Sequence, residues 1–329
     1  MRTNLEDSLY KHESNKENFD SLIETYTRDA NIFVAFLGSG IGSALKEVPD
    51  NQELYDKQCE RHKFVGKSDS DEGPQLFNDL YDYVEHKEMF DQEIFQLVTP
   101  RDTSGTATHS QIARAFNCFV TTNFYDPIEK IFEDRQEEME KKPDKLSAHY
   151  FSFPEDNAKF TLTYLHGHKR IGFCILRQND YRYFYPSLYE KRAGVYAVEN
   201  SLRHIFTKRI VVFLGCSLEP HLKNFFEYLS KKVEKDRKSI TSDLLIREVK
   251  THYWITSDSQ IRQFLNGVPD HEQNSYKLKY FDNFRKINIR PIVYVGDHIF
   301  IEDLCKTLAR KLKSSITSPT SIHDDPSRE

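Results

Sequence analysis

Residues 32–42 read IFVAFLGSGIG, a continuous apolar run that ends in closely spaced glycines. An apolar run of this length is typical of a strand in a parallel sheet that helices cover on both faces. Similar runs follow at 118–122, 161–165, 171–176, 210–214, 252–256 and 289–295, and helical patterns separate most of them. Strands that alternate with helices predict an α/β fold with a doubly wound parallel sheet.

The rest of the chain is expected to build on this sheet as one domain over residues 1–313. Helical patterns at 17–30, 195–206 and 299–312 fit the layers that cover a sheet. Helical insertions are expected at about 50–116 and about 130–160, where the sequence is charged and aromatic. The tail, residues 314–329, is rich in Ser, Thr, Pro and Asp and is expected to be disordered.

Composition limits the classes of protein to which the chain can belong. Its 329 residues carry a net charge of −5 and show no basic stripe, so a dedicated nucleic-acid binder is disfavoured. No apolar run approaches the roughly 18–20 residues that span a bilayer. The start shows no signal-peptide pattern, and a cytoplasmic location is expected.

Cysteine usage agrees with a reducing compartment. The five cysteines are scattered and odd in number, which offers no disulfide framework. No C-x-x-C pair occurs, so the spacing excludes a four-cysteine zinc module. We expect no metal in this protein.

Polar residues gather where the expected strands end. The clusters are Gly38-Ser39-Gly40, Thr121-Thr122-Asn123, His166-Gly167-His168 and Gly215-Cys216-Ser217. Ligands of open α/β sheets bind beyond the carboxyl ends of the strands. The four clusters are therefore expected to converge on one crevice.

The glycine cluster after the first strand suits close approach of the backbone to a pyrophosphate. It departs from the G-x-G-x-x-G pattern because Gly42 comes one residue early. A plain tight turn fits the same residues. No G-x-x-x-x-G-K-[ST] motif is present, which argues against a P-loop NTPase.

Two of the clusters carry groups that could take part in catalysis. Asn123 could orient a hydroxyl group or a water molecule, although an Asx turn ahead of the Asp126-Pro127 helix cap fits as well. His166 follows a strand directly and is placed as a general base, with His168 as the fallback. The two histidines lack a third metal ligand at a recognisable spacing.

Ser217 allows two interpretations. Its hydroxyl could bind a ribose or a phosphate, or it could be the nucleophile of an incomplete G-x-S-x-G elbow in which Glu219 replaces the second glycine. The aromatic residues of 181–185 suit core packing, or a lid over a planar ring.

Taken in order, these motifs resemble a sirtuin-like domain over about residues 32–312. Residues 38–41 are similar to the family's G-A-G-x-S turn, with Ser39 in place of Ala and the later serine displaced to Ser43. Residues 48–50 resemble the Pro-Asp that follows this turn. Residues 121–123 are similar to the T-T-N-Y-D segment of the prokaryotic defence branch, with Tyr125 where that branch has Asp.

The later motifs extend this resemblance. His166-Gly167 matches the catalytic H-G, residues 179–181 resemble a D-Y element, and residues 214–218 look like the ribose-side G-x-S-L turn. Residues 287–294 resemble the closing strand of the family. Deacylating sirtuins carry a zinc module after the H-G, and this chain does not, so the resemblance is to the zinc-free anti-phage NAD hydrolases.

The resemblance implies a Rossmann-like, sirtuin-type fold and an enzyme that hydrolyses NAD to ADP-ribose and nicotinamide. It implies Asn123 and His166 as the catalytic pair. It also implies that NAD, the substrate, is bound by Gly38, Ser39, Gly40, Ser43, Thr122, Asp126, Gly215, Ser217 and Leu218.

The resemblance further implies a regulated effector of anti-phage defence, because unrestrained NAD loss would kill the host. The expected switches are homo-oligomerisation or a separately encoded partner, such as a HerA-type ATPase or a short Argonaute. Neither direct nucleic-acid binding nor membrane association is expected. Two alternatives stay open: a non-catalytic module that binds NAD or ADP-ribose, which Tyr125 favours, and a zinc-free NAD-dependent protein deacylase. A serine hydrolase that uses Ser217 is a further reading.

Overall fold

Six of the expected strands pair in parallel, together with the additional strand β3, into one sheet of seven strands in the order β3-β4-β2-β1-β7-β8-β9. The strands are β1 (Phe33–Leu37), β2 (Cys118–Thr121), β3 (Ser147–Tyr150), β4 (Thr161–Tyr164), β7 (Ile210–Leu214), β8 (His252–Ser257) and β9 (Ile289–Tyr294). The prediction of an α/β fold with a doubly wound parallel sheet is therefore confirmed.

The structure is a computed structural model, and it describes most but not all of the chain. The described residues are 5–9, 13–42, 51–65, 73–99, 106–125, 127–138, 146–154, 160–189, 196–216, 218, 224–228, 231, 250–265, 268–296 and 299–317. Among these residues, no helix combines the length and the apolar character needed to cross a membrane.

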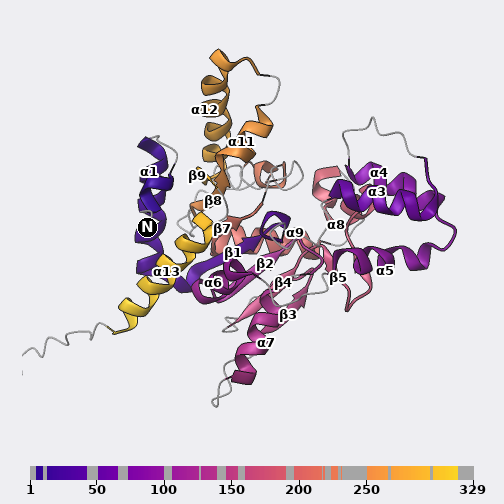
Figure 1. Cartoon of the computed structure of the whole chain (residues 1–329), viewed down its shortest axis with the longest axis horizontal. Coiled ribbons are helices and arrows are strands. Elements are labelled where there is room, and N and C mark those ends of the chain that lie inside the picture. The colour runs from indigo at the N-terminus through magenta and orange to yellow at the C-terminus, as the bar shows by residue number, and fades with distance from the viewer. Residues whose placement is uncertain are drawn as a thin grey trace, which may run out of the picture.

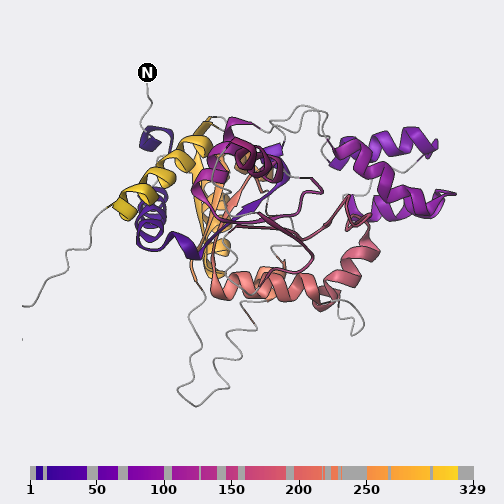
Figure 2. The ribbon, with the colours of Figure 1, turned by 90° about the horizontal axis from the view of Figure 1, so that it is seen from below.

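Helices cover both faces of the sheet (Figures 1 and 2). One layer contains α1 (Glu13–Arg28), α6 (Ala107–Ala115), α7 (Ile128–Glu138) and α13 (Ile299–Thr317). The other contains α8 (Gln178–Phe184), α9 (Ala197–Lys208), α11 (Asp258–Phe264) and α12 (Asp270–Lys286). The structure also contains short helical turns: η1 (Leu5–Ser8), η2 (Ala30–Ile32), α2 (Ser39–Gly42) and η3 (Pro186–Tyr189).

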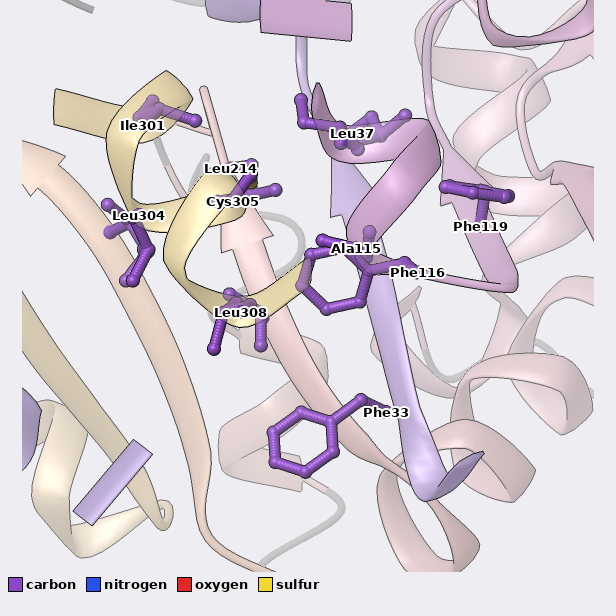
Figure 3. Close-up of a cluster of buried hydrophobic side chains, with 14 of the residues drawn as sticks. Phe33, Leu37, Ala115, Phe116, Phe119, Leu214, Ile301, Leu304, Cys305 and Leu308 are labelled. Carbon is purple, nitrogen blue, oxygen red and sulfur yellow. The ribbon is translucent and has the colours of Figure 1, made fainter. Parts of the chain in front are cut away.

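The continuous apolar run of β1 is explained by burial on both faces. Phe33 and Leu37 pack into the layer of α1 and α13, whereas Val34 and Phe36 pack into the layer of α8 and α9. Successive side chains of a strand point to opposite faces, so both faces must be apolar. Figure 3 shows the first layer, where α13 turns a helical stripe of side chains toward the sheet: Ile301, Leu304, Cys305 and Leu308.

Three helices between β1 and α6 form a separate bundle, which we call the helical insert. They are α3 (Asn51–His62), α4 (Gly73–Tyr83) and α5 (Lys87–Val98), and they share their own apolar core. Figures 1 and 2 place this insert at the end of the molecule that carries α8. The insertion expected at about 50–116 is shorter than predicted, because α6 packs against α13 and the sheet instead.

Three sequence predictions need correction. The second expected insertion, about 130–160, is not helical throughout, because it contains the edge strand β3. The sequence does not predict β3, because its side chains are only partly buried and lack an apolar pattern. Helix α13 continues through Thr317, so the start of the expected disordered tail is helical, and residues 318–329 lie outside the described part of the chain.

The third correction concerns the strand expected at 171–176. Only β6 (Phe173–Cys174) is extended, and it pairs antiparallel with β5 (Gly167–His168) as a small hairpin outside the main sheet. Gly167 has a φ of +97°, and a Cβ there would overlap the Phe173 carbonyl oxygen. The glycine therefore allows the chain to fold back directly after His166.

Candidate functional site

The turns after β1 and β7 pack against each other at the centre of the sheet. The chain leaves β1 toward β2 on one side, and it continues from β7 to β8 and β9 on the other. In open α/β sheets such a reversal of strand order opens a crevice at the carboxyl edge. The sheet topology therefore places the glycine turn of residues 38–42 and the Gly215 turn at the expected ligand site.

Hydrogen bonds join these two turns. The Gly38 N–H donates to the Leu214 carbonyl over 3.0 Å, and the Gly40 N–H donates to the Gly215 carbonyl over 2.9 Å. Two of the N–H groups that were candidates for a pyrophosphate are therefore engaged within the protein. Ser39 is exposed and is the part of this turn that is left to meet a ligand.

Close packing of the turns explains why they contain glycine. A Cβ at Gly40 would lie 2.7 Å from the Gly215 oxygen, and one at Gly38 would lie 2.8 Å from the Cys216 Sγ. Real Cβ atoms do not approach other atoms so closely. The glycine identities thus follow from contact between two turns of the protein, before any ligand is considered.

Replacing Gly215 with alanine is expected to destabilise the fold more than the same change at Gly172. The two residues have φ angles of +62° and +64°, so both variants bear the left-handed strain of roughly 1–2 kcal/mol. Only at Gly215 would the methyl group also collide with Ile41, at 2.6 Å from its Cγ1. The free energy of unfolding in urea should fall by about 1–3 kcal/mol more for Gly215→Ala. Equal losses would contradict this account of the turn.

Asn123 is anchored to the glycine turn. Its Nδ2 donates to the Gly38 carbonyl over 3.2 Å, and its backbone N–H donates to the Thr121 hydroxyl over 3.1 Å. That hydroxyl in turn donates to the Leu37 carbonyl over 3.0 Å. The local turn is thus closed by the Thr121 hydroxyl, as in an ST turn, and the Asn123 carboxamide is held against the glycine turn at the carboxyl edge of the sheet.

His166 is buried in the layer of α8. Its Nε2 is hydrogen-bonded to the Tyr185 hydroxyl over 2.8 Å, and its ring meets the edge of Tyr181 at a centroid distance of 5.5 Å. His166 is 6% exposed and Tyr185 is 1% exposed. A hydrogen bond between two buried groups restricts the orientation of the imidazole plane.

Asn123 and His166 leave neighbouring strands at equivalent positions. Thr121 of β2 pairs with Tyr164 of β4, and each functional residue follows two positions later. The Leu165 N–H donates to the Thr121 carbonyl over 2.9 Å, so the segments that follow β2 and β4 stay adjacent beyond the strands. The fold thus brings an amide and an imidazole from distant parts of the sequence to adjoining loops.

His168 lies in a different environment from His166. Its ring packs at a tilt against the rings of Tyr164 and Tyr150, at centroid distances of 4.4 Å and 5.6 Å, and its Nδ1 accepts the Arg170 N–H. Burial, with smaller contributions from Arg170 and Lys169, lowers the pKa of His168 to about 4. His168 is neutral near pH 7, and its surroundings give it a packing role, so His166 is the better candidate for the general base.

Side-chain contacts tie the His166 hairpin to the segment that follows Asn123. The Lys169 ammonium lies 5.3 Å from the centre of the Tyr125 ring. Arg170 forms an ion pair with Glu129 of α7, which also accepts a hydrogen bond from Tyr164. Tyr125 therefore has a structural partner in the hairpin, at the position where the sirtuin-like pattern has Asp.

The remaining predicted residues are only partly covered. Thr122 and Gly215 are half-buried, and Leu218 is buried with a φ of +47°. Ser43, Asp126 and Ser217 lie outside the described residues, so their predicted roles stay predictions. In the described part of the chain, no group of three or more His, Cys, Asp and Glu side chains could hold a metal ion.

Sequence reasoning missed the partners of His166. The aromatic pattern predicts a core or lid role for Tyr181 and Tyr185, and it does not predict their contacts with His166. No sequence motif singles out Arg177. The spacing of the two tyrosines could have predicted a shared role. They lie four residues apart, at the end of α8 and directly after it, in the segment that follows the H-G motif. The local sequence offers Arg177 only the pairing with Asp180, and its contacts with Asp91 and Tyr81 come from distant helices.

One comparison with known proteins identifies a family. A family model for the SIR2-like domain matches residues 117–292, which span β2 to β9 and include Asn123, His166 and Gly215. The glycine turn after β1 and the helical insert lie outside the matched segment. No curated protein matches the chain.

Proposed function

The chain belongs to the SIR2-like domain family, and from this premise we propose that it binds NAD as a substrate and hydrolyses the bond between nicotinamide and ribose. Members of this family are NAD-dependent enzymes, either deacylases or NADases. The observation that carries the proposal is the placement of Asn123 and His166 on adjoining loops beyond β2 and β4.

The proposed reaction needs little acid catalysis. Nicotinamide leaves from a positively charged pyridinium, so the bonding electron pair neutralises the ring and leaves an oxocarbenium-like ribose. Water then attacks this ribose carbon and loses a proton. The products are nicotinamide, ADP-ribose and one proton.

Asn123 and His166 have different roles in this scheme. The carboxamide of Asn123, held by the Gly38 carbonyl, orients the attacking water or a ribose hydroxyl. His166 accepts the proton, a contribution worth about 10²–10⁴-fold in rate. The hydrogen bond between Nε2 and the Tyr185 hydroxyl keeps the imidazole in one orientation. The base role requires the tautomer whose Nε2–H donates to the Tyr185 oxygen, so that His166 accepts the proton at Nδ1.

The other half of NAD is assigned to the turns at the centre of the sheet. The Gly38 and Gly40 N–H groups donate to the carbonyls of Leu214, the last residue of β7, and of Gly215, so we assign the pyrophosphate to Ser39 and to the outer side of both turns. Ser217 and Leu218 are proposed to hold the adenosine ribose. Binding energy from this remote half can orient the nicotinamide ribose for cleavage.

Chromatographic analysis of NAD after incubation with the purified chain tests the proposal. Formation of nicotinamide and ADP-ribose in equal amounts, without an acyl-lysine peptide, is the expected result. The incubation is run with and without the product of the neighbouring gene, because a regulated enzyme needs its activator. NAD that stays intact in both cases supports a binding module, and NAD loss only with the peptide supports a deacylase.

The biological setting proposed here is anti-phage defence in the cytoplasm. Uncontrolled NAD loss would be lethal, so activity is proposed to depend on homo-oligomerisation or on a partner such as a HerA-type ATPase or a short Argonaute. Gel filtration of the chain, alone and with the neighbouring gene product, measures both forms of assembly.

A further inference from the structure

The helical insert packs against segments next to both proposed catalytic residues, and one face of α5 contacts each of these segments. The Asp91 and Phe95 side chains lie four residues apart, so they project from the same face of this helix. Their side chains are largely buried, whereas Gln92 and Gln96 on the same helix are exposed. Asp91 points toward the His166 side of the site and Phe95 toward the Asn123 side, as the contacts below establish.

The first contact leads from Asp91 to His166. The Asp91 carboxylate lies 3.8 Å from the guanidinium of Arg177 and accepts a hydrogen bond from the Cys174 thiol of β6 over 3.5 Å. The Arg177 Nε also donates to Asp180 over 2.7 Å, and Asp180 caps the start of α8 by accepting the Arg177 N–H.

Helix α8 and the residue after it deliver the tyrosines that contact His166. Tyr181 directly follows the capping Asp180, and Tyr185, whose hydroxyl holds the His166 Nε2, lies one turn later. Arg177 also stacks over the Tyr81 ring of α4 at 4.2 Å. A buried arginine thus joins two helices of the insert to the helix that orients the imidazole.

The second contact leads from Phe95 to Asn123. The Phe95 ring meets Phe124 edge-on, at a centroid distance of 6.2 Å, and Phe124 packs against the core of the insert. Phe124 is the residue directly after Asn123. A shift of α5 would therefore move the backbone that carries the carboxamide.

We propose that Asp91 and Phe95 of α5 are positioning residues that together set the placement of His166 relative to Asn123. The inference rests on the proposed function, and it assigns a role to an insert that lies outside the SIR2-like match. A device of this kind makes NAD cleavage sensitive to anything that moves the insert, including a bound partner. Displacements of about 1 Å can lower the rate of an enzyme by roughly 100-fold.

The test uses Asp91→Asn and Phe95→Leu, with Gln92→Ala and Gln96→Ala as controls on the exposed face of α5. Asp91→Asn leaves Arg177 paired with Asp180, and Phe95→Leu keeps an apolar side chain, so both variants should fold. Each is expected to lower kcat for NAD cleavage about tenfold or more while KM changes by less than about threefold, the pattern of a lost transition-state interaction. The two controls should keep wild-type kinetics.

A second measurement does not depend on turnover. In NMR spectra of the full chain, Asp91→Asn should shift the His166 ring signals and Phe95→Leu should shift the Asn123 side-chain amide signals. The His166→Gln and Asn123→Ala variants assign these signals. Wild-type signals in both α5 variants, or kinetics equal to those of the glutamine controls, would overturn the proposal. If the wild-type chain fails to cleave NAD both with and without the neighbouring gene product, the proposed function fails, and the NMR shifts still decide whether α5 positions the two side chains.

Discussion

Replacement of His166 by alanine or glutamine is expected to lower nicotinamide release from NAD by about 10²–10⁴-fold, the range typical of a lost general base. Glutamine is the more informative change, because it can still hydrogen-bond to the Tyr185 hydroxyl and leaves a smaller cavity. Loss of activity in His166→Gln with an unchanged thermal midpoint would assign the effect to proton transfer.

The neighbouring histidine provides the comparison. His168→Phe keeps a ring against Tyr164 and Tyr150 and removes an Nε2 that has no hydrogen-bond partner among the described residues. The change also removes the Nδ1 that accepts the Arg170 N–H, but Arg170 is exposed and water can replace that acceptor. Because a buried unpaired nitrogen costs free energy, the free energy of unfolding of this variant should be close to that of the wild type, and the variant should retain NAD cleavage. The reverse result, an active His166→Gln and an inactive His168→Phe, would move the general base to His168.

Asn123→Ala is expected to reduce NAD cleavage by about 10²–10³-fold, the loss seen when one oriented hydrogen-bonding side chain is removed from a transition state. The Asn123→Asp variant should be no better. Its carboxylate would place an oxygen where the Nδ2 now donates to the Gly38 carbonyl, 3.2 Å away, and two acceptors repel each other.

Asn117→Ala is the matched control for this prediction. Asn117 lies just before β2, at the opposite end of the strand from Asn123, so the change has the same chemistry on the same element. Asn117 is half-buried and lies away from the proposed site, so the change should leave kcat and KM within about twofold of the wild type, and any loss should appear in stability instead. Wild-type cleavage by Asn123→Ala would remove the carboxamide from the mechanism.

Periodicity was sufficient to predict the central strands of the sheet. β1, β2 and β7 are short, mostly apolar runs buried on both faces, and this burial is why their sequences lack alternation. β4 is buried just as fully, although Thr161 and Thr163 alternate with Leu162 and Tyr164. β3 could not be found in this way, because an edge strand can be held by backbone hydrogen bonds to β4 while its side chains stay partly exposed.

The candidate site likewise has a part that the sequence predicts and a part that it does not. That Asn123 and His166 would be brought to one edge of a sheet could be inferred from the chain, because parallel strands all end at the same edge and each residue follows a strand. The side chains and carbonyl groups that contact these two residues could not be inferred from the sequence. Asn123 binds a carbonyl 85 residues away, and Asp91 of the insert meets Cys174 across 83 residues.

Local patterns along this chain were therefore enough for its class of fold, its central strands and the chemical types at the strand ends, because hydrogen bonding and burial within each element act over a few residues. The packing of two glycine turns, the hydrogen bond of Tyr185 to His166 and the contacts of α5 arose only once the chain had folded. Such contacts depend on the distances between separate helices and loops, and a local sequence pattern does not predict those distances.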